Sequence, residues 1–194
     1  MKKLICLAFV VAVGLPVLAQ KPELTSGNLA DLKHLKSVGV EVTYEKLLVG
    51  AEIAEADFIA ARKNNWDTKE PGKGDEWEQY WHKSKGLYEP AFANNFLINS
   101  GVSVNPKSPF KMILKVFQIE PGWNGGPMGG PAFILSELWI VDSANPEKII
   151  AVLKLPRYKG NDKTGGDFEM GRRIEQAFAT AGKQIGLYFK AKVI

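Results

Sequence analysis

The order of the strand-forming segments is the strongest constraint on how this chain can fold. Residues 110–119 (FKMILKVFQI), 132–142 (AFILSELWIVD) and 148–155 are apolar segments that follow one another with turn-forming residues between them. Consecutive strands joined by such turns pair in antiparallel fashion. The sequence therefore predicts a meander of strands in the second half of the chain.

The region before the meander predicts one strand followed by helices. Residues 38–44 alternate between apolar and polar side chains, which is the period of a half-buried strand. Residues 52–64 predict a short helix, and Asp75 is placed to cap the start of a second one. The Glu89–Pro90 pair predicts a restart, because proline is well tolerated at the first position of a helix, and Gly101 is expected to end it.

The last part of the chain carries the clearest helix pattern. Apolar side chains recur at steps of four, three, four and four, which places them on one helix face: Ile174, Phe178, Ala181, Ile185 and Phe189. Because the strands are grouped together, we predict an α+β domain over residues 37–194. It has a mostly antiparallel sheet of about four strands, with helices packed on one face and the C-terminal helix covering the sheet. The sheet residues expected under that helix are Met112, Leu114, Leu138 and Ile140.

The first nineteen residues are typical of a secretory signal peptide. Lys2 and Lys3 precede an apolar run from Leu4 to Val13, and small residues follow up to Ala19. We expect cleavage between Ala19 and Gln20, with residues 20–36 forming a lead-in segment. The alternative is a membrane anchor, but the run is too short to span a bilayer as a helix.

Cysteine usage and charge restrict the location and the partners. The only cysteine, Cys6, lies inside the apolar run, so the processed chain would have no disulfide. This favours a periplasmic or secreted bacterial protein without a covalent anchor or an integral membrane span. The formal net charge is +4, with basic and acidic residues interleaved. That pattern does not favour a nucleic-acid partner, and a homo-oligomer stays an open alternative.

The middle of the chain also resembles a known group of proteins. The residues that carry the resemblance are Glu120–Gly122, the Gly-rich turn after them, the strand from Ala132 to Asp142, and Lys148–Ala151. They resemble a widespread group of exported bacterial proteins of unknown function, many of them lipoproteins. That group is distantly similar to small α/β domains of outer-membrane assembly lipoproteins. The resemblance implies a cell-envelope location and a binding or assembly role rather than an enzyme. The chain departs from the lipoproteins because it lacks a cysteine at the expected mature start.

Catalytic, cofactor and metal motifs are missing from the sequence. Glu78 and His82 are four residues apart, a spacing that more often marks an exposed pair on a helix than a metal site. A periplasmic hydrolase acting on glycan or peptide is the alternative to a binding protein. It would need titratable groups to converge in one pocket, and the candidates are Glu120, Glu137, His82 and Asp142. We therefore predict no catalytic residue, no cofactor and no metal, and a partner that is another envelope protein or a polymer.

A symmetric hairpin around residue 126 predicts the register of the first two meander strands. It pairs Glu137 with Lys115, Trp139 with Ile113, and Leu135 with Phe117. The resulting face is too apolar for a fully solvated surface and too charged for a sealed core. Either the lead-in segment covers it, or a second copy of the chain or an envelope partner does, with Trp139 as the anchor.

Aromatic side chains are the remaining candidates for a binding surface. The full candidate set is Trp123, Trp139, Phe117, Phe133, Trp77 and Trp81. Trp77 and Trp81 belong to an aromatic stripe at helical spacing, which more often marks a core than a ligand platform. The loop from Glu120 to Pro131 is either a plain hairpin loop or a ligand-binding loop with Trp123 as a stacking surface.

Overall fold

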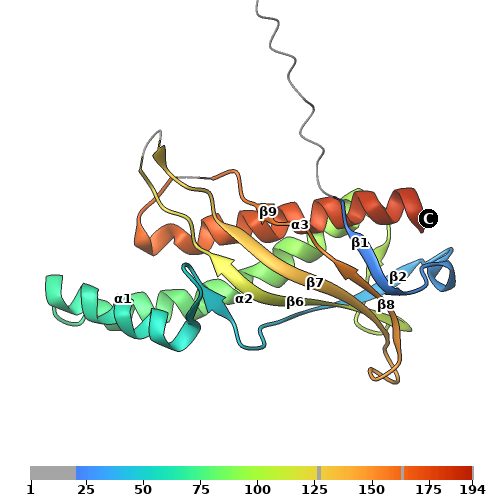
Figure 1. The fold of residues 1–194 in the computed structure, drawn as a ribbon, viewed down its shortest axis with the longest axis horizontal. Helices are drawn as coiled ribbons and strands as arrows, with labels where there is room; N and C mark the ends of the chain where they lie inside the picture. Colours follow the sequence, from blue (N-terminus) through green and yellow to red (C-terminus); the bar gives the residue numbers. More distant parts are fainter. Residues whose placement is uncertain (1–20, 126–127, 163, 194) are drawn as a thin grey trace, which may run out of the picture.

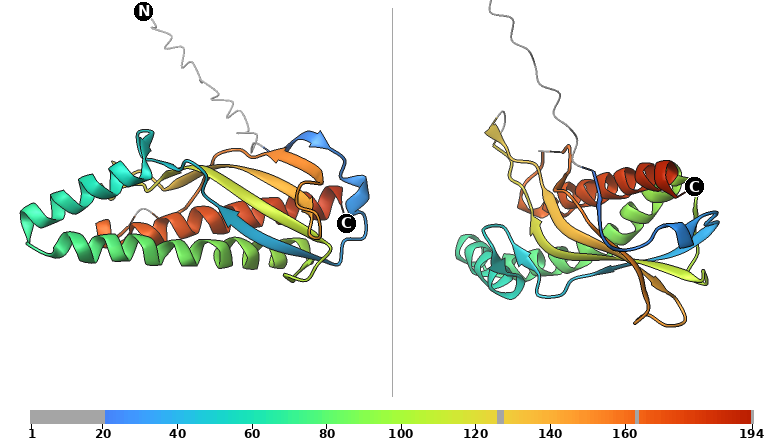
Figure 2. Two further views of the ribbon diagram at one scale, coloured as in Figure 1. Left: turned by 90° about the horizontal axis from the view of Figure 1, so that it is seen from below. Right: turned by 45° about the vertical axis from the view of Figure 1, so that its right-hand side comes forward.

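The protein is an α+β structure of two layers, a twisted sheet and a pair of long helices behind it (Figure 1). The computed structural model describes residues 21–125, 128–162 and 164–193. Seen from below, the sheet and the helices separate into the two layers (Figure 2). The predicted signal peptide and its cleavage point lie outside the described residues.

The sheet corrects the predicted one in both size and strand direction. Within the described residues it has nine strands, and its main path runs β1-β8-β7-β6-β2-β5. The strands are β1 (Glu23–Gly27), β2 (Ser37–Thr43), β3 (Leu48–Val49), β4 (Ile53–Ala54), β5 (Ser103–Val104), β6 (Phe110–Glu120), β7 (Phe133–Asp142), β8 (Ile149–Lys154) and β9 (Tyr158–Lys159). The predicted mostly antiparallel sheet of about four strands is therefore wrong.

Parallel pairing accounts for part of that error. β2 runs parallel to both β6 and β5, and β3 runs parallel to β6. Two helices lie between β2 and β6 in the sequence, and such a long crossover is what parallel neighbours require. The other missed strands are mostly two residues long, too short to show a period of two in the sequence.

The helices differ from the predicted ones at their ends, and the first two are longer. They are α1 (Glu55–Lys69), α2 (Lys73–Ser100) and α3 (Met170–Lys192), with 3-10 turns at Ala30–Leu32 and Asp167–Glu169. α2 continues through Pro90 instead of restarting there. An internal proline costs about 3 kcal/mol, and the continuous buried face of α2 offsets that cost. The predicted stop is confirmed, since Gly101 ends α2 in the left-handed conformation with φ of 78°.

The start of α2 is capped from the preceding helix. Asp67 Oδ1 accepts hydrogen bonds from the backbone N–H groups of Gly72 and Gly74, at 3.1 and 2.8 Å. Asp75, the predicted cap, instead forms an ion pair with Lys63. The sequence analysis did not find this cap because Asp67 lies in α1 and reaches the start of α2 only when the turn between the two helices has formed.

The core lies between the two long helices and the inner face of the sheet. The apolar stripe of α3 and the four predicted sheet residues are all at most 1% exposed and belong to one hydrophobic cluster. The rings of Phe178 and Tyr88 stack at 4.8 Å between centroids, which joins α3 to α2. The predicted inner face of the sheet is therefore confirmed.

The predicted lead-in segment extends the sheet and does not cover its open face. β1 pairs with β8 at the sheet edge, and Leu32 of the following turn is buried in the core. Figure 1 shows this N-terminal strand beside β8. The described part of the lead-in segment therefore does not cover the face that carries Trp139, which was one of the two alternatives for that face.

Candidate functional site

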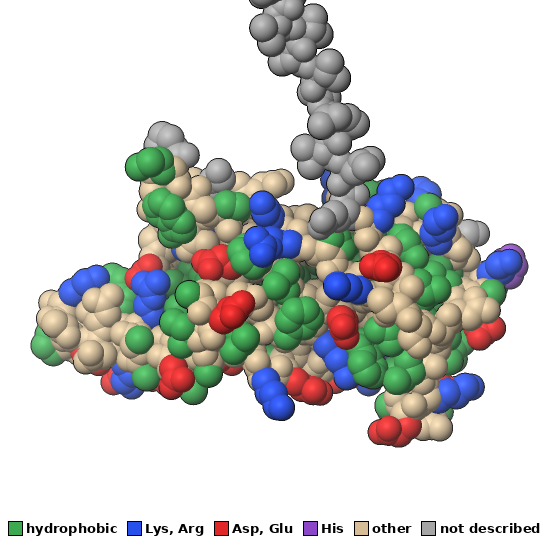
Figure 3. Space-filling view, in the orientation of Figure 1, with side chains coloured by type: hydrophobic (Ala, Val, Ile, Leu, Met, Phe, Trp, Pro, Cys, Tyr) green, Lys and Arg blue, Asp and Glu red, His purple; other side chains and the backbone are tan. Residues whose placement is uncertain are grey.

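The outer face of the sheet, opposite the helices, carries most of the candidate surface. It is turned toward the viewer in Figure 3, where apolar side chains lie among charged ones of both signs. Along β7, the outward positions alternate with fully buried ones, because successive side chains of a strand point to opposite faces. The outward residues of the central strands include Ile113, Lys115, Phe117, Phe133, Leu135, Glu137 and Trp139.

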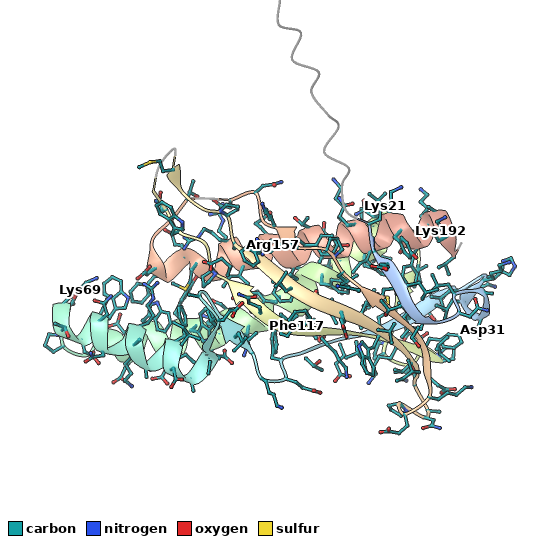
Figure 4. The ribbon with its side chains drawn as sticks, viewed as in Figure 1. Lys21, Asp31, Lys69, Phe117, Arg157 and Lys192 are labelled. Atoms are coloured by element: carbon teal, nitrogen blue, oxygen red, sulfur yellow. The ribbon has the colours of Figure 1, made fainter. Side chains whose placement is uncertain are left out.

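The predicted register is correct for the middle of the hairpin and wrong nearer its loop. Lys115 pairs with Glu137 and Ile113 pairs with Trp139, as predicted. Leu135, however, pairs with Gln118, because a bulge interrupts β6 between Val116 and Gln118. The extra residue in the bulge is Phe117, which is left 43% exposed on the outer face (Figure 4).

Trp139 is the centre of a small polar and aromatic cluster on this face. The Lys115 Nζ lies 3.5 Å from the centroid of the Trp139 ring, a cation–π arrangement. The indole N–H of Trp139 donates to Glu137 Oε2 at 3.1 Å. Trp139 is thus held in place by side chains of its own face while its ring stays partly accessible. We call Lys115, Glu137 and Trp139 the central cluster.

A row of alternating charge crosses the strands beside this cluster. Lys115 is opposite Glu137, Glu137 is opposite Lys154, and Lys154 is opposite Glu23 on β1. Opposite charges in directly facing positions stabilise a sheet modestly.

A second feature, the hairpin groove, lies where β6 and β7 lead into their connecting loop. It is an open depression of about 400 Å³, lined by Glu120, Gly122, Trp123, Gly130, Pro131, Phe133, Arg157 and Lys159. Trp123 and Gly130 exchange two backbone hydrogen bonds of 3.0 Å across the loop. These bonds hold Trp123 at the mouth of the groove, with 54% of its surface exposed.

Glycines give the Trp123 ring its position. A Cβ atom on Gly130 would lie 2.7 Å from Trp123 Nε1, and one on Gly125 would lie 2.1 Å from its Cζ3. Any larger residue at either position would displace the ring. Gly122 has φ of 68°, a conformation that favours glycine. The Gly-rich composition of the loop therefore serves to seat an indole against the backbone.

Two cations flank the groove on the other side. β9 pairs with the start of β7, with Lys159 opposite Phe133. The guanidinium carbon of Arg157 lies 4.2 Å from the centroid of the Phe133 ring, and Figure 4 shows Arg157 on the outer face. Within the described part of the chain, the ion pairs include neither Arg157 nor Lys159.

A buried arginine holds the loops that border the groove. The Arg173 side chain is 1% exposed and donates to five backbone carbonyls. Its acceptors are the carbonyls of Pro121, Gly122, Thr164, Gly165 and Gly166, at 3.0 to 3.4 Å. The hairpin base and the loop before α3 are thus tied to one side chain.

Two titratable groups near these loops have shifted pKa values. Hydrogen bonds from the side chain and backbone of Thr164 hold the pKa of Asp162 below its ordinary value, with smaller effects from Arg172 and Arg173. Burial raises the pKa of the Tyr158 phenol well above its ordinary value. Both groups therefore keep one charge state at neutral pH, and neither is poised for proton transfer.

Trp77 and Trp81 are not part of any surface, which corrects their place in the candidate set. Both are 0% exposed, and their rings stack on each other at 5.9 Å and contact Phe58 of α1. The Trp81 indole N–H donates to Glu55 Oε1 at 2.7 Å. The stripe is a core stripe, the alternative favoured by its helical spacing.

The candidate hydrolytic groups do not converge. Phe133, the partner of Glu120, lies four residues before Glu137 on β7, or about 13 Å along a strand. Asp142 ends the same strand at its other end, and His82 is on α2 in the helical layer. The His82 side chain is exposed and its Nε2 lies 4.0 Å from Glu78 Oε1, and Glu78 also pairs with Lys63. Within the described residues, no group of three or more His, Cys, Asp or Glu side chains could hold a metal ion.

Sequence reasoning missed the basic side of the groove. Arg157 and Lys159 follow the last predicted strand of the meander, and only the long-range pairing of β9 with β7 brings them to Phe133. No local signal marks them. Arg173 carried no signal either, since it precedes Ile174 by one residue and so lies about 100° around the helix from it, outside the predicted apolar stripe.

Comparisons with known proteins add little to this geometry. No protein-family model matches the sequence, and a search of curated proteins finds no match. A solved PelC dodecamer from Paraburkholderia phytofirmans is similar with a TM-score of 0.40 and 12% identity, over 85% of this chain and 96% of that one. A variant PelC dodecamer from the same organism is similar with a TM-score of 0.38 and 12% identity, over 86% of this chain and 98% of that one. None of the described helices has the length and apolar character needed to cross a membrane. At this level of likeness the function has to be argued from the site.

Proposed function

We propose that this protein is a non-enzymatic binding or assembly protein of the cell envelope, which contacts another envelope protein or a polymer through the outer face of its sheet. The envelope setting rests on the signal-peptide pattern and on the resemblance to exported bacterial proteins. The binding role rests on one observation above the others. Within the described residues, no helix covers the face that carries Trp139, Phe117, Phe133 and Leu135; Phe117 is exposed there and the other three are half-buried.

Physical reasoning supports a partner for this face. A solvated sheet face is normally polar, so that the sheet alternates apolar-in and polar-out. Here both faces carry large apolar side chains, but only the inner one is covered by helices (Figure 2). Contiguous exposed apolar surface rimmed by charges is typical of interaction sites. Tryptophan and arginine are also the residues most enriched where binding energy is concentrated.

The hydrolase alternative has weaker support. Hydrolysis of a glycan or peptide requires two or more titratable groups in one concave site. The four candidate groups are spread over two strands and a helix, so a catalytic site built from them is not the function that the geometry favours.

The test is to compare envelope retention of Trp139→Lys with that of Ile98→Lys. Both substitutions place a lysine at an apolar position, but Ile98 lies on α2 and is 77% exposed. We expect Trp139→Lys to lose co-sedimentation with purified cell envelopes while its melting temperature changes little. Ile98→Lys should behave like the parent protein. If Trp139→Lys is retained as well as the parent, the outer face is not the contact surface and the proposal is wrong.

A further inference from the structure

We infer that the hairpin groove binds a carboxylate-bearing glycan, with the sugar ring on Trp123 and the carboxylate on Arg157 and Lys159. This inference rests on the proposed function and names the class of polymer. It concerns a different part of the outer face from the central cluster. The two can therefore be tested separately.

The first step of the argument is the exposure of Trp123. An indole that is 54% exposed costs solvation free energy unless something covers it. The loop nevertheless holds it in place, with two backbone hydrogen bonds and two glycines that no larger residue could replace without moving the ring. A ring that is both fixed and exposed offers a flat apolar platform with little conformational entropy left to lose on binding.

The second step is the charge of the groove. Arg157 and Lys159 line it, and among the described residues of the lining Glu120 carries the one carboxylate. Glu120 Oε1 already accepts a hydrogen bond from the backbone N–H of Gly122 at 3.1 Å. The groove thus has a surplus of positive charge. A carboxylate is the complementary ligand, since guanidinium binds it through paired hydrogen bonds.

The third step is the shape of the groove. It is an open depression on the face of the sheet, bordered by backbone at Gly122, Gly130 and Pro131. A peptide added to a sheet binds along a strand edge through main-chain hydrogen bonds, whereas this groove lies at the hairpin end on a face. A flat ring against the indole and a carboxylate beside it match a uronic acid unit of a polysaccharide.

The experiment measures binding of the purified protein to polygalacturonate, to neutral dextran and to poly-L-glutamate by titration calorimetry. We expect polygalacturonate to bind best, and we expect its affinity to fall as salt is added. Trp123→Ala and Arg157→Gln should each weaken polygalacturonate binding about tenfold or more, as expected for the loss of a stacking surface or of a charged hydrogen-bonding group.

Two variants serve as matched controls. Met128→Ala removes an 80% exposed apolar side chain from the same loop outside the groove lining. Lys148→Gln removes one positive charge between β7 and β8, at the other end of β7 from the groove. Both should bind polygalacturonate like the parent. Each groove variant should also keep the parent melting temperature, since Trp123 and Arg157 lie outside the hydrophobic core.

The outcomes separate this inference from the proposed function. Equal binding of dextran, or unchanged polygalacturonate binding by the groove variants, would overturn it. Poly-L-glutamate binding with the same dependence on Trp123 and Arg157 would also overturn it, in favour of an acidic peptide. If polygalacturonate does not bind but Trp139→Lys still loses envelope retention, only this inference fails. If Trp139→Lys is retained, the proposed function fails whatever the groove binds.

Discussion

The inner and outer faces of the sheet come from the same strands but differ in what surrounds them. Neighbouring residues of β7 show this directly, since Leu138 is 0% exposed under the helices while Trp139 is partly exposed on the open side. Along β7 the inner face is apolar apart from the buried Ser136, and it lies close to α3. The outer face mixes aromatic rings with a row of alternating charges.

This difference separates the side chains that stabilise the fold from the side chains that are available for binding. The inner side chains gain from burial, so their loss should be measured in the free energy of unfolding. The outer side chains are held by one another, as Trp139 is by Lys115 and Glu137. Their loss should be measured in binding. The following substitutions test that division, from the largest expected effect to the smallest.

Lysine at position 138 or 139 gives the sharpest contrast. Leu138→Lys buries an unpaired charge in the core, and we expect the free energy of unfolding to fall by more than about 5 kcal/mol. Trp139→Lys should cost less than about 2 kcal/mol, because the lysine can reach solvent. Urea denaturation followed by circular dichroism measures both. Similar losses at the two positions would mean that the outer face is packed as tightly as the inner one.

Truncation of Phe178 tests the contact between α3, α2 and the sheet. Phe178→Ala should lower the free energy of unfolding by about 3–5 kcal/mol, the usual range for a buried phenylalanine. Leu187→Ala, on the same helix at 43% exposure, is the control and should cost less than about 1 kcal/mol. An unchanged thermal midpoint for Phe178→Ala would show that α3 does not close the core.

Arg173 joins the two regions, since it is buried with the core and holds the loops of the groove. Arg173→Met removes the donors of five carbonyls, and we expect a loss of about 2–3 kcal/mol. Hydrogen exchange should also become faster at Gly122 and Gly165. Arg173→Lys keeps the charge, and its free energy of unfolding should lie between those of the parent protein and Arg173→Met. Full stability of Arg173→Met would contradict the assigned role.

Substitution of Gly130 has the smallest effect on stability and the most local one. Gly130→Ala places a methyl group against the Trp123 ring. We expect the fluorine NMR signal of fluorotryptophan-labelled Trp123 to shift, with a stability change of less than about 1 kcal/mol. Gly86→Ala is the control, because a Cβ there meets no atom within 4 Å. An unmoved Trp123 signal in Gly130→Ala would mean that the glycine does not position the ring.

Local periodicity accounts for the parts that the sequence predicted well. The steps of four and three between Ile174 and Phe189 identify α3 and its buried face, because a helix repeats its contacts every 3.6 residues. The strands of the meander and the pairing of Ile113 with Trp139 follow from alternation and a symmetric turn. One bulge at Phe117 was enough to shift the register beyond it.

Long-range packing decided the rest. The parallel pairing of β2 with β6 and the continuity of α2 through Pro90 depend on contacts between segments far apart in the chain. So does the groove, where β9 brings Arg157 to Phe133. A short pattern can show which side of a helix or strand is apolar. Which segment covers that side, and which side stays open, depends on the free energy of the whole packed molecule, and no window of sequence contains it.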